Sequence, residues 1–336
     1  MNVFVGANGA GKTSVLEGAF LLSHARSFRR GAREALLQRG STGMSVFAQV
    51  RYADGHARRL GLGRTGARWE ARIDGDSVAI GELVRACAVV CFEPGAHALI
   101  AGGAEERRRY LDWGVFHVEQ EFLTSWRRYQ RALKQRNSLL RLGTTPASDA
   151  MFEPWELELS QAAHQIDTQR RAYLDLLRPK LESSVTGLLP ELGAMELRYR
   201  RGWSEDQALA DQLRTQRGRD SARGHTSVGA HRADWSVSFD HAPLREHLSR
   251  GQEKLTALAC MLAQAALYAE HHGEWPIVCL DDLASELDQE HQASGVAQLM
   301  AVRAQVLLTG TELPAALRDA PARVFHVEQG ALTRLL

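Results

Sequence analysis

The sequence is poor in cysteine, in lysine and in long apolar runs. Only four of its 336 residues are cysteines, and no pair of CxxC motifs or nearby histidine pair accompanies Cys87, Cys91, Cys260 and Cys279. This pattern predicts reduced, buried thiols in a cytoplasmic protein and argues against disulfides or a zinc site. No stretch of 18 apolar residues occurs, so we expect no transmembrane helix, and no secretory signal is visible.

The charges nearly cancel over the whole chain but are segregated along it. Only four of 41 basic residues are lysines, and 40 acidic residues leave a net charge of +1, which by itself argues against nucleic-acid binding. Residues 24–72, however, hold eleven arginines and three acids, whereas residues 268–292 hold seven acids and no lysine or arginine. Arginine suits phosphate recognition. A GC-rich genome produces the same bias and is the simpler explanation.

Both ends of the chain follow a β/α pattern. Residues 2–5 predict a buried strand, which a glycine-rich loop joins to a helix over residues 15–24. Residues 44–79 alternate apolar and polar positions, with Asp-Gly pairs at the turns, and predict a hairpin meander. The last third predicts helices and strands at 250–270, 276–280, 288–300 and 305–309, followed by a hairpin at 323–335.

The middle of the chain is predicted to be helical. Apolar residues at alternating spacings of three and four run from Phe122 to Leu140 and from Trp155 to Leu177, with turn residues between them. This favours an antiparallel helical hairpin, although an ordinary two-helix piece of a globular core fits equally well. Residues 204–217 predict a polar helix capped by Ser204 and Gln207, and residues 218–234 a loop. The predicted fold class is an α/β head from residues 1–103 and 225–336, with a mainly helical arm inserted at 104–224.

A phosphate-binding loop opens the chain. Residues 6–13 fit GxxxxGK[ST], and a strand precedes the loop while a helix follows it, which is the context this motif requires. Inward-turned amides cradle phosphates, Lys12 reaches the β- and γ-phosphates, and the Thr13 hydroxyl binds Mg²⁺. The alternative is a plain glycine-rich turn. The predicted nucleotide contacts are Gly6, Ala7, Asn8, Gly9, Ala10, Gly11, Lys12, Thr13 and Ser14.

Two carboxylates follow the apolar strand at 276–280. Charges at a strand end are common on any surface, but in a chain with a phosphate loop the pair is more specific. Asp281 is predicted to bind Mg²⁺, and Asp282 to orient or deprotonate the attacking water.

A third motif, Leu-Ser-Arg-Gly-Gln at residues 248–252, opens a helix. Alone it is an ordinary helix start, but together with the other two motifs it resembles the LSGGQ signature of ABC-type ATPases. The resemblance implies that Ser249 and Gly251 close over the γ-phosphate held by a second subunit, so that two ATP molecules lie between two copies. Residues 285–288 resemble the D-loop of that class.

Further stretches resemble the RecF family of bacterial recombinational-repair ATPases, an SMC-like branch of the ABC class. They match in order over essentially the whole chain and lie at residues 25–29, 92–94, 102–112, 226–234 and 280–288. The resemblance implies a weak, DNA-stimulated ATPase that dimerises on ATP, binds duplex DNA near single-strand gaps and is released by slow hydrolysis. It also implies a role in loading RecA with RecO and RecR, in DNA replication, repair and the SOS response.

Two alternatives stay open. An ABC transporter subunit is disfavoured by the 237 residues between Lys12 and Ser249, which is far more than transporters have. A DNA clamp that never hydrolyses its ATP is the other. The chain also departs from the family pattern: it lacks a few dozen residues before the first strand, so we expect a fragment or a start assigned late. Asp282 stands where the class often has glutamate, which predicts slow hydrolysis, and no switch histidine follows residues 305–309.

Arginines after the phosphate loop and on the first arm helix are candidate DNA contacts. Backbone-based, salt-sensitive binding is expected, since no RNA-recognition aromatic platform is visible in the sequence. The alternative is an ordinary solvated face. Residues 107–109 could contact DNA, support the nucleotide site or pair with neighbouring acids, and His231 and Arg232 could position lobes of the head or sense nucleotide. The predicted DNA contacts are Arg26, Arg29, Arg30, Arg127, Arg128 and Lys134.

Overall fold

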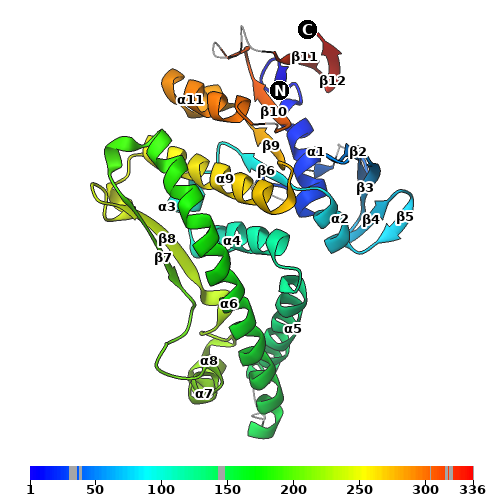
Figure 1. Ribbon diagram of the computed structural model, residues 1–336. Helices are drawn as coiled ribbons and strands as arrows, with labels where there is room; N and C mark the ends of the chain where they lie inside the picture. Colours follow the sequence, from blue (N-terminus) through cyan, green and yellow to red (C-terminus); the bar gives the residue numbers. More distant parts are fainter. Residues whose placement is uncertain are drawn as a thin grey trace. The chain divides into compact units, whose positions relative to one another are not determined.

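The computed structural model describes residues 1–29, 36–37, 40–142, 148–302, 304–314, 317 and 321–335. The chain divides into two compact units (Figure 1). The head consists of Met1–His97, Ser183–Glu191 and Leu248–Leu336, and the arm of Ala98–Glu182 and Leu192–His247. Within the described residues, none of the helices is both long and apolar enough to cross a membrane.

A six-stranded sheet forms the centre of the head, in the order β12-β11-β1-β10-β9-β6. Strand β1 pairs in parallel with β10 and β11, and β9 pairs in parallel with β10 and β6. The carboxyl ends of β1, β9 and β10 therefore meet at one edge, where ligands bind in open α/β sheets. The strands are β1 (Asn2–Val5), β6 (Val89–Phe92), β9 (Ile277–Leu280), β10 (Val306–Gly310), β11 (Arg323–Glu328) and β12 (Ala331–Arg334).

The predicted meander is confirmed as a second, antiparallel sheet of β2 (Gly43–Arg51), β3 (Ala57–Thr65), β4 (Arg68–Ile73) and β5 (Asp76–Val78). Helix α1 (Lys12–His24) contacts strands of both sheets, and Leu16, Leu60 and Val89 are fully buried in the core that they share. The other helices of the head are α2 (Ile80–Ala86), α9 (Arg250–His272), α10 (Leu283–Glu286) and α11 (Gln289–Met300).

The arm contains the predicted pair of long helices, α5 (Phe122–Leu140) and α6 (Asp149–Leu188). Arg128 bonds Glu158 whereas Ser125 bonds Gln165, so the two helices run antiparallel, as predicted. The last residues of α6, from Ser183, belong to the head. The remaining elements of the arm are α3 (Ala98–Ala101), α4 (Ala104–Val118), β7 (Met195–Arg200), α7 (Leu209–Thr215), α8 (Arg217–Arg223) and β8 (Asp234–Phe239), with short 3₁₀ turns at Ala230–Arg232 and Arg245–His247. A further 3₁₀ turn, Pro190–Leu192, spans the limit between the two units.

Two local predictions in the arm are wrong. The helix expected to start at Ser204 begins at Leu209, because the Ser204 hydroxyl accepts a hydrogen bond from the Asp206 amide in a tight turn. The segment expected to be a loop holds α8 and the start of β8. The domain limits also differ: residues 225–247 lie in the arm, since β8 pairs with β7, whereas the sequence had placed them in the head.

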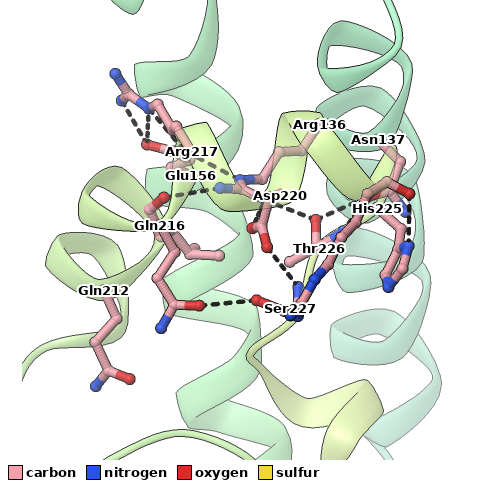
Figure 2. A network of polar contacts seen from close by, with 12 residues as sticks. Arg136, Asn137, Glu156, Gln212, Gln216, Arg217, Asp220, His225, Thr226 and Ser227 are labelled. Carbon is pink, nitrogen blue, oxygen red and sulfur yellow. Dashed lines mark hydrogen bonds and ion pairs between the residues drawn. The ribbon is translucent and has the colours of Figure 1, made fainter.

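A buried charge network ties the arm together (Figure 2). Arg136 of α5 is fully buried and donates to Glu156 of α6, Asp220 of α8 and the Thr226 hydroxyl at 3.0, 2.7 and 2.8 Å. Arg217 donates to both oxygens of Glu156. A buried ion costs several kcal/mol of desolvation unless it is paired and hydrogen-bonded. The network therefore fixes how α5, α6 and α8 pack, because any other packing leaves a buried charge without its partner.

All four cysteines lie in the described residues and are free thiols, and Cys87, Cys260 and Cys279 are buried. Burial raises the pKa of the Cys260 thiol to about 12. These observations agree with the expectation of reduced thiols packed in the core.

Candidate functional site

The glycine-rich loop between β1 and α1 closes around the amine of Lys12. Gly9 and Gly11 adopt φ angles of +83° and +108°, which only glycine adopts without strain. The Lys12 side chain is 8% exposed, and its Nζ donates to the carbonyls of Gly6 and Ala7 at 2.8 and 3.0 Å. The amine is therefore held inside the loop by carbonyl partners that a stronger acceptor, such as a phosphate oxygen, can replace.

The β11-β12 hairpin supports this loop from the adjacent edge of the sheet. The Gly330 amide donates to the Ala10 carbonyl at 2.9 Å. At Gly6, a Cβ atom would lie 2.3 Å from the Val327 carbonyl oxygen, so no larger residue fits there. By contrast, Ala7, Asn8, Gly9 and Ser14 are exposed, and the tip of the loop is open to a ligand.

Asp281 lies beside the loop and is 4% exposed. The Thr13 hydroxyl donates to its Oδ1 at 3.0 Å, and the Thr309 hydroxyl donates to the same oxygen at 2.6 Å. The parallel order β1-β10-β9 brings these three side chains together from distant parts of the sequence. The structure thus joins the two residues predicted to hold Mg²⁺.

The sequence showed Thr309 in place of a switch histidine but gave it no role. Its hydroxyl, besides donating to Asp281, accepts from the Asp282 amide at 2.9 Å, so it links both carboxylate residues. Its position at the end of β10, the strand between β1 and β9, could have indicated this role. In a parallel sheet such a residue faces the same edge as the phosphate loop.

Asp282 stands at the start of α10 with φ of +51°, an uncommon conformation for a residue other than glycine. Its Oδ2 accepts from the Ser285 hydroxyl at 2.7 Å. This bond orients the carboxylate, and the left-handed backbone turns the chain sharply after β9. Strained backbone of this kind often occurs at functional sites.

The third motif forms the exposed N-terminus of α9. The Ser249 hydroxyl accepts from the Gln252 amide at 3.3 Å, and Gln252 Oε1 accepts from the Ser249 amide at 3.0 Å, which completes a capping box. A Cβ at Gly251 would meet only Ser249 Oγ, at 3.9 Å, so the chain's own packing does not require a glycine there. Between described residues, no hydrogen bond or ion pair joins Ser249 or Gly251 to the phosphate loop.

The donor set beside the loop fits a magnesium ion that is shared with a phosphate. Within the described ranges, no cluster of three histidine, cysteine or acidic side chains could hold a metal by itself. Mg²⁺ is usually bound through one or two carboxylates together with substrate phosphates and waters. The Thr13 hydroxyl and the buried Asp281 carboxylate, 3.0 Å apart at the mouth of a phosphate loop, are the residues that would hold such an ion.

The predicted DNA contacts fall into two groups. Arg29 forms an ion pair with Glu17 at 3.5 Å, Arg26 lies over the Phe20 ring, and Arg128 makes a two-pronged pair with Glu158 at 2.8 and 3.0 Å. These side chains are therefore engaged within the protein. Arg30 lies outside the described residues.

Arg127 and Lys134 are different. Both are exposed, and neither side chain has a hydrogen-bond or ion-pair partner among the described residues. They are seven residues apart on α5 and so share one face of the helix, with Arg131 between them. Among the described residues, the Arg131 side chain has one ion-pair partner, Glu158, at 3.8 Å.

The other basic candidates have roles inside the arm. Arg107 forms a nearly buried ion pair with Asp234 at 2.7 Å, Arg108 donates to the Ala233 carbonyl, and Arg109 pairs with Glu105 and Glu106, as the sequence had offered. These bonds occupy all three arginines.

His231 is held between Tyr129 and the backbone. Its Nδ1 lies 2.6 Å from the Tyr129 hydroxyl, and its Nε2 lies 3.0 Å from the Thr226 carbonyl. Burial lowers the pKa of His231 to about 4, so the ring is neutral at physiological pH. Its contacts place it in the arm unit, together with the Arg136 network through Thr226.

The RecF/RecN/SMC N terminal domain model matches residues 1–333. A protein of Xanthomonas euvesicatoria pv. vesicatoria (strain 85-10), named DNA replication and repair protein RecF, is 49% identical over 99% of this chain and 92% of its own length. A protein of the same name from Stutzerimonas stutzeri (strain A1501) is 40% identical over 100% of this chain and 91% of its own length.

Two solved structures share the fold. The structure of the recombination mediator protein RecF-ATP in the RecFOR pathway has a TM-score of 0.89 and 24% identity, covering 100% of this chain and 91% of that chain. The Smc head bound to the C-winged helix domain of ScpA has a TM-score of 0.55 and 13% identity, covering 99% and 89%. These likenesses confirm the predicted fold class, an α/β head of the SMC type.

Proposed function

The chain belongs to the RecF family of DNA replication and repair proteins, and from that premise we propose that its head is an ATP-controlled dimerisation switch that holds the protein on DNA. Family membership counts against the transporter alternative. The proposal assigns a part to each motif of the head.

ATP and Mg²⁺ are the ligands of the phosphate loop in this proposal. A solved relative described as RecF-ATP supports the choice of nucleotide. Lys12 exchanges its two carbonyl partners for phosphate oxygens, and the Thr13 hydroxyl and Asp281 hold the metal. When bound, Mg²⁺ neutralises charge on the phosphates. Thr309 keeps Asp281 oriented, because its hydroxyl donates to the Oδ1 that also accepts from Thr13.

Dimerisation uses the exposed start of α9. The Ser249 hydroxyl accepts one bond from its own helix and keeps its proton for an acceptor on a second copy. Open space around Gly251 lets a phosphate approach the helix N-terminus, whose amides favour anions. Two copies would thus complete two composite nucleotide sites.

Hydrolysis in this proposal is slow and serves to release the protein. Asp282 acts on the attacking water, but its carboxylate is shorter than the glutamate common in the class and is already bonded to Ser285. A weak, DNA-stimulated ATPase is therefore expected. A clamp that never hydrolyses ATP is the competing version.

The DNA partner is duplex DNA near single-strand gaps, contacted through unpaired basic side chains such as Arg127 and Lys134. The solved relative belongs to the RecFOR pathway. By that likeness, we propose RecO and RecR as partners, RecA loading as the outcome, and the cytoplasm, where bacterial DNA lies, as the place of action.

The observation that carries the proposal is the 3.0 Å contact between Thr13 and Asp281 at the mouth of the loop. The test measures binding of a fluorescent ATP analogue with and without Mg²⁺. We expect Asp281→Asn to remove most of the Mg²⁺-dependent affinity, a loss of about tenfold or more, and Lys12→Met to abolish binding.

Glu290→Gln is the matched control, because Glu290 is an exposed acidic residue in the first turn of α11, in the same acidic segment and outside the motifs. It should bind like the wild type. If Asp281→Asn also binds Mg²⁺-nucleotide like the wild type, the assignment of the metal site is wrong. Single-turnover hydrolysis in Asp282→Asn separates the switch from the competing clamp, because only a switch has hydrolysis to lose.

A further inference from the structure

The outer face of the β2-β5 sheet carries an aromatic side chain where a polar one is expected. In strand β2, Met44, Val46, Ala48 and Val50 pack against the core of the head, so the alternate residues face solvent. One of these is Phe47, which is 70% exposed. Antiparallel sheets with one solvated face normally place polar residues there, and this exposed ring is open to contact by a ligand.

A strip without side chains lies beside Phe47. Cross-strand partners share a face, and the register sets Phe47 opposite Gly61 and Gly61 opposite Arg72. A second glycine of β3, Gly63, lies two residues beyond Gly61 and is the diagonal neighbour of Phe47. A Cβ at Gly61 would meet only Arg72 Cβ, at 3.8 Å, and one at Gly63 only the Met44 carbonyl, at 3.9 Å, so the space above both is open. Glycines inside a strand often mark a close approach by a ligand.

Three arginines lie on the same face as this strip. Arg51, Arg59 and Arg72 are exposed on the same face, and none has a side-chain hydrogen bond or ion pair with another described residue. The acidic neighbours are Glu70, which pairs with Arg68 at 3.4 Å, and Asp74, whose carboxylate accepts from the Arg59 amide. The face therefore combines an exposed aromatic ring on bare backbone with three arginine side chains that form no ion pair with described residues, and the carboxylates of Glu70 and Asp74 lie beside them.

We propose that this face binds single-stranded nucleic acid, with one base stacked on Phe47 over the Gly61–Gly63 strip and its phosphates on Arg59 and Arg72. Aromatic platforms with cationic borders bind unpaired bases, whereas the bases of a duplex are stacked on one another and expose only their edges. An acidic polypeptide would satisfy the arginines but leave the ring and the open strip without a partner. The site is separate from the nucleotide site and acts with or without ATP.

The test measures fluorescence anisotropy of labelled oligothymidylate, without added nucleotide. A second strand of equal length and charge that lacks bases is the comparison. Stacking contributes about 1–3 kcal/mol per base, so Phe47→Ala should weaken oligothymidylate binding about tenfold and leave the base-free strand unaffected. Phe47→Trp should bind like the wild type.

Gly61→Val gives an independent test, because it fills the strip without a contact shorter than 3.8 Å at Cβ. It should reproduce the loss while retaining the wild-type melting temperature. Leu332→Ala is the matched control, since Leu332 is a 50% exposed apolar residue on β12 of the same unit. It should leave binding unchanged.

Three outcomes would overturn the proposal: unchanged oligothymidylate affinity in Phe47→Ala, an equal loss on the base-free strand, or displacement of the oligonucleotide by polyglutamate at matched ionic strength. Lys12→Met should keep oligothymidylate binding while losing ATP. A failure of the nucleotide site and a failure of this face are therefore distinguishable.

Discussion

At the scale of single residues, two glycines in the head have different reasons for being glycine. Gly6 has no room, because a Cβ would collide with the Val327 backbone at 2.3 Å. Gly251 has room, since its nearest contact would be at 3.9 Å. Packing within the protein therefore requires glycine at position 6. At position 251 it does not, and the space there can admit an approaching molecule.

Alanine at these two positions should separate stability from dimerisation. Gly6→Ala is expected to lower the free energy of unfolding by about 1–3 kcal/mol, as overpacking does, whereas Gly251→Ala should change it by less than about 0.5 kcal/mol. Gly251→Ala should instead reduce the ATP-dependent dimer fraction. Chemical denaturation and light scattering measure the two effects, and wild-type dimerisation of Gly251→Ala would contradict the assigned role.

His231 makes the stability of the arm depend on pH. Its pKa is about 4 in the folded protein and 6.5 when exposed, so the unfolded chain binds the extra proton first as pH falls. Stability is therefore lost as pH falls from about 6.5 toward 4, by about 2 kcal/mol at pH 5.

His231→Gln should lose about 2 kcal/mol less than the wild type between pH 7.5 and pH 5, whatever its stability at pH 7.5. Urea denaturation at the two pH values measures this difference. Identical pH dependence in the two proteins would show that His231 is not held neutral.

At the scale of elements, helix α5 presents different chemistry on its two sides. One side buries Arg136 in its ion-pair network, and the other exposes Arg127 and Lys134. In the sequence, the basic residues of this helix form one run with no visible difference between them. The fold separates them, because partners on α6 and α8, distant in sequence, occupy some and leave others to solvent.

The exposed pair on α5 should contribute to DNA affinity through phosphates. Each phosphate contact that is lost reduces the slope of log K against log salt by about 1. Changing Arg127 and Lys134 to glutamine together should therefore reduce it by about 2. The control is Arg109→Gln, because Arg109 is paired with Glu105 and Glu106. The measurement is duplex affinity over a range of salt concentrations. An unchanged slope in the double variant would show that α5 does not contact the DNA.

Local patterns predicted most of the head and less of the arm. The phosphate loop, the meander and the strand before Asp281 have strong periodicity and motif spacing. Strand β8 was missed, because its partner β7 lies more than thirty residues away and nothing local marks the pairing. The role of Thr309 was missed for a similar reason, since that role arises only from the strand order. The polar neighbours that displaced the predicted helix start at Ser204 are also invisible to a capping pattern.

At the scale of the whole molecule, the net charge of +1 is the sum of an acidic segment and an arginine-rich segment that have different surroundings. The acidic segment surrounds the edge of the sheet where Asp281 meets the phosphate loop. The arginine-rich segment includes the outer face of the β2-β5 sheet, where Arg51, Arg59 and Arg72 remain unpaired by described residues. A net charge near zero therefore does not argue against nucleic-acid binding in this chain.

The proposed switch depends most on nucleotide sites that are shared between two copies. Lys12→Met removes the phosphate-loop half of a site, and Ser249→Arg blocks the signature half. Neither variant alone should dimerise on ATP. An equal mixture contains one complete site per heterodimer, because the first variant supplies the signature and the second the loop.

Sedimentation velocity of the two variants, separately and mixed, with ATP and Mg²⁺ is the most direct measurement. The proposed switch predicts monomers in the separate samples and a dimer in the mixture, at a lower fraction than in the wild type. If the mixture stays monomeric while the wild type dimerises, or if either variant alone dimerises like the wild type, the composite site is wrong.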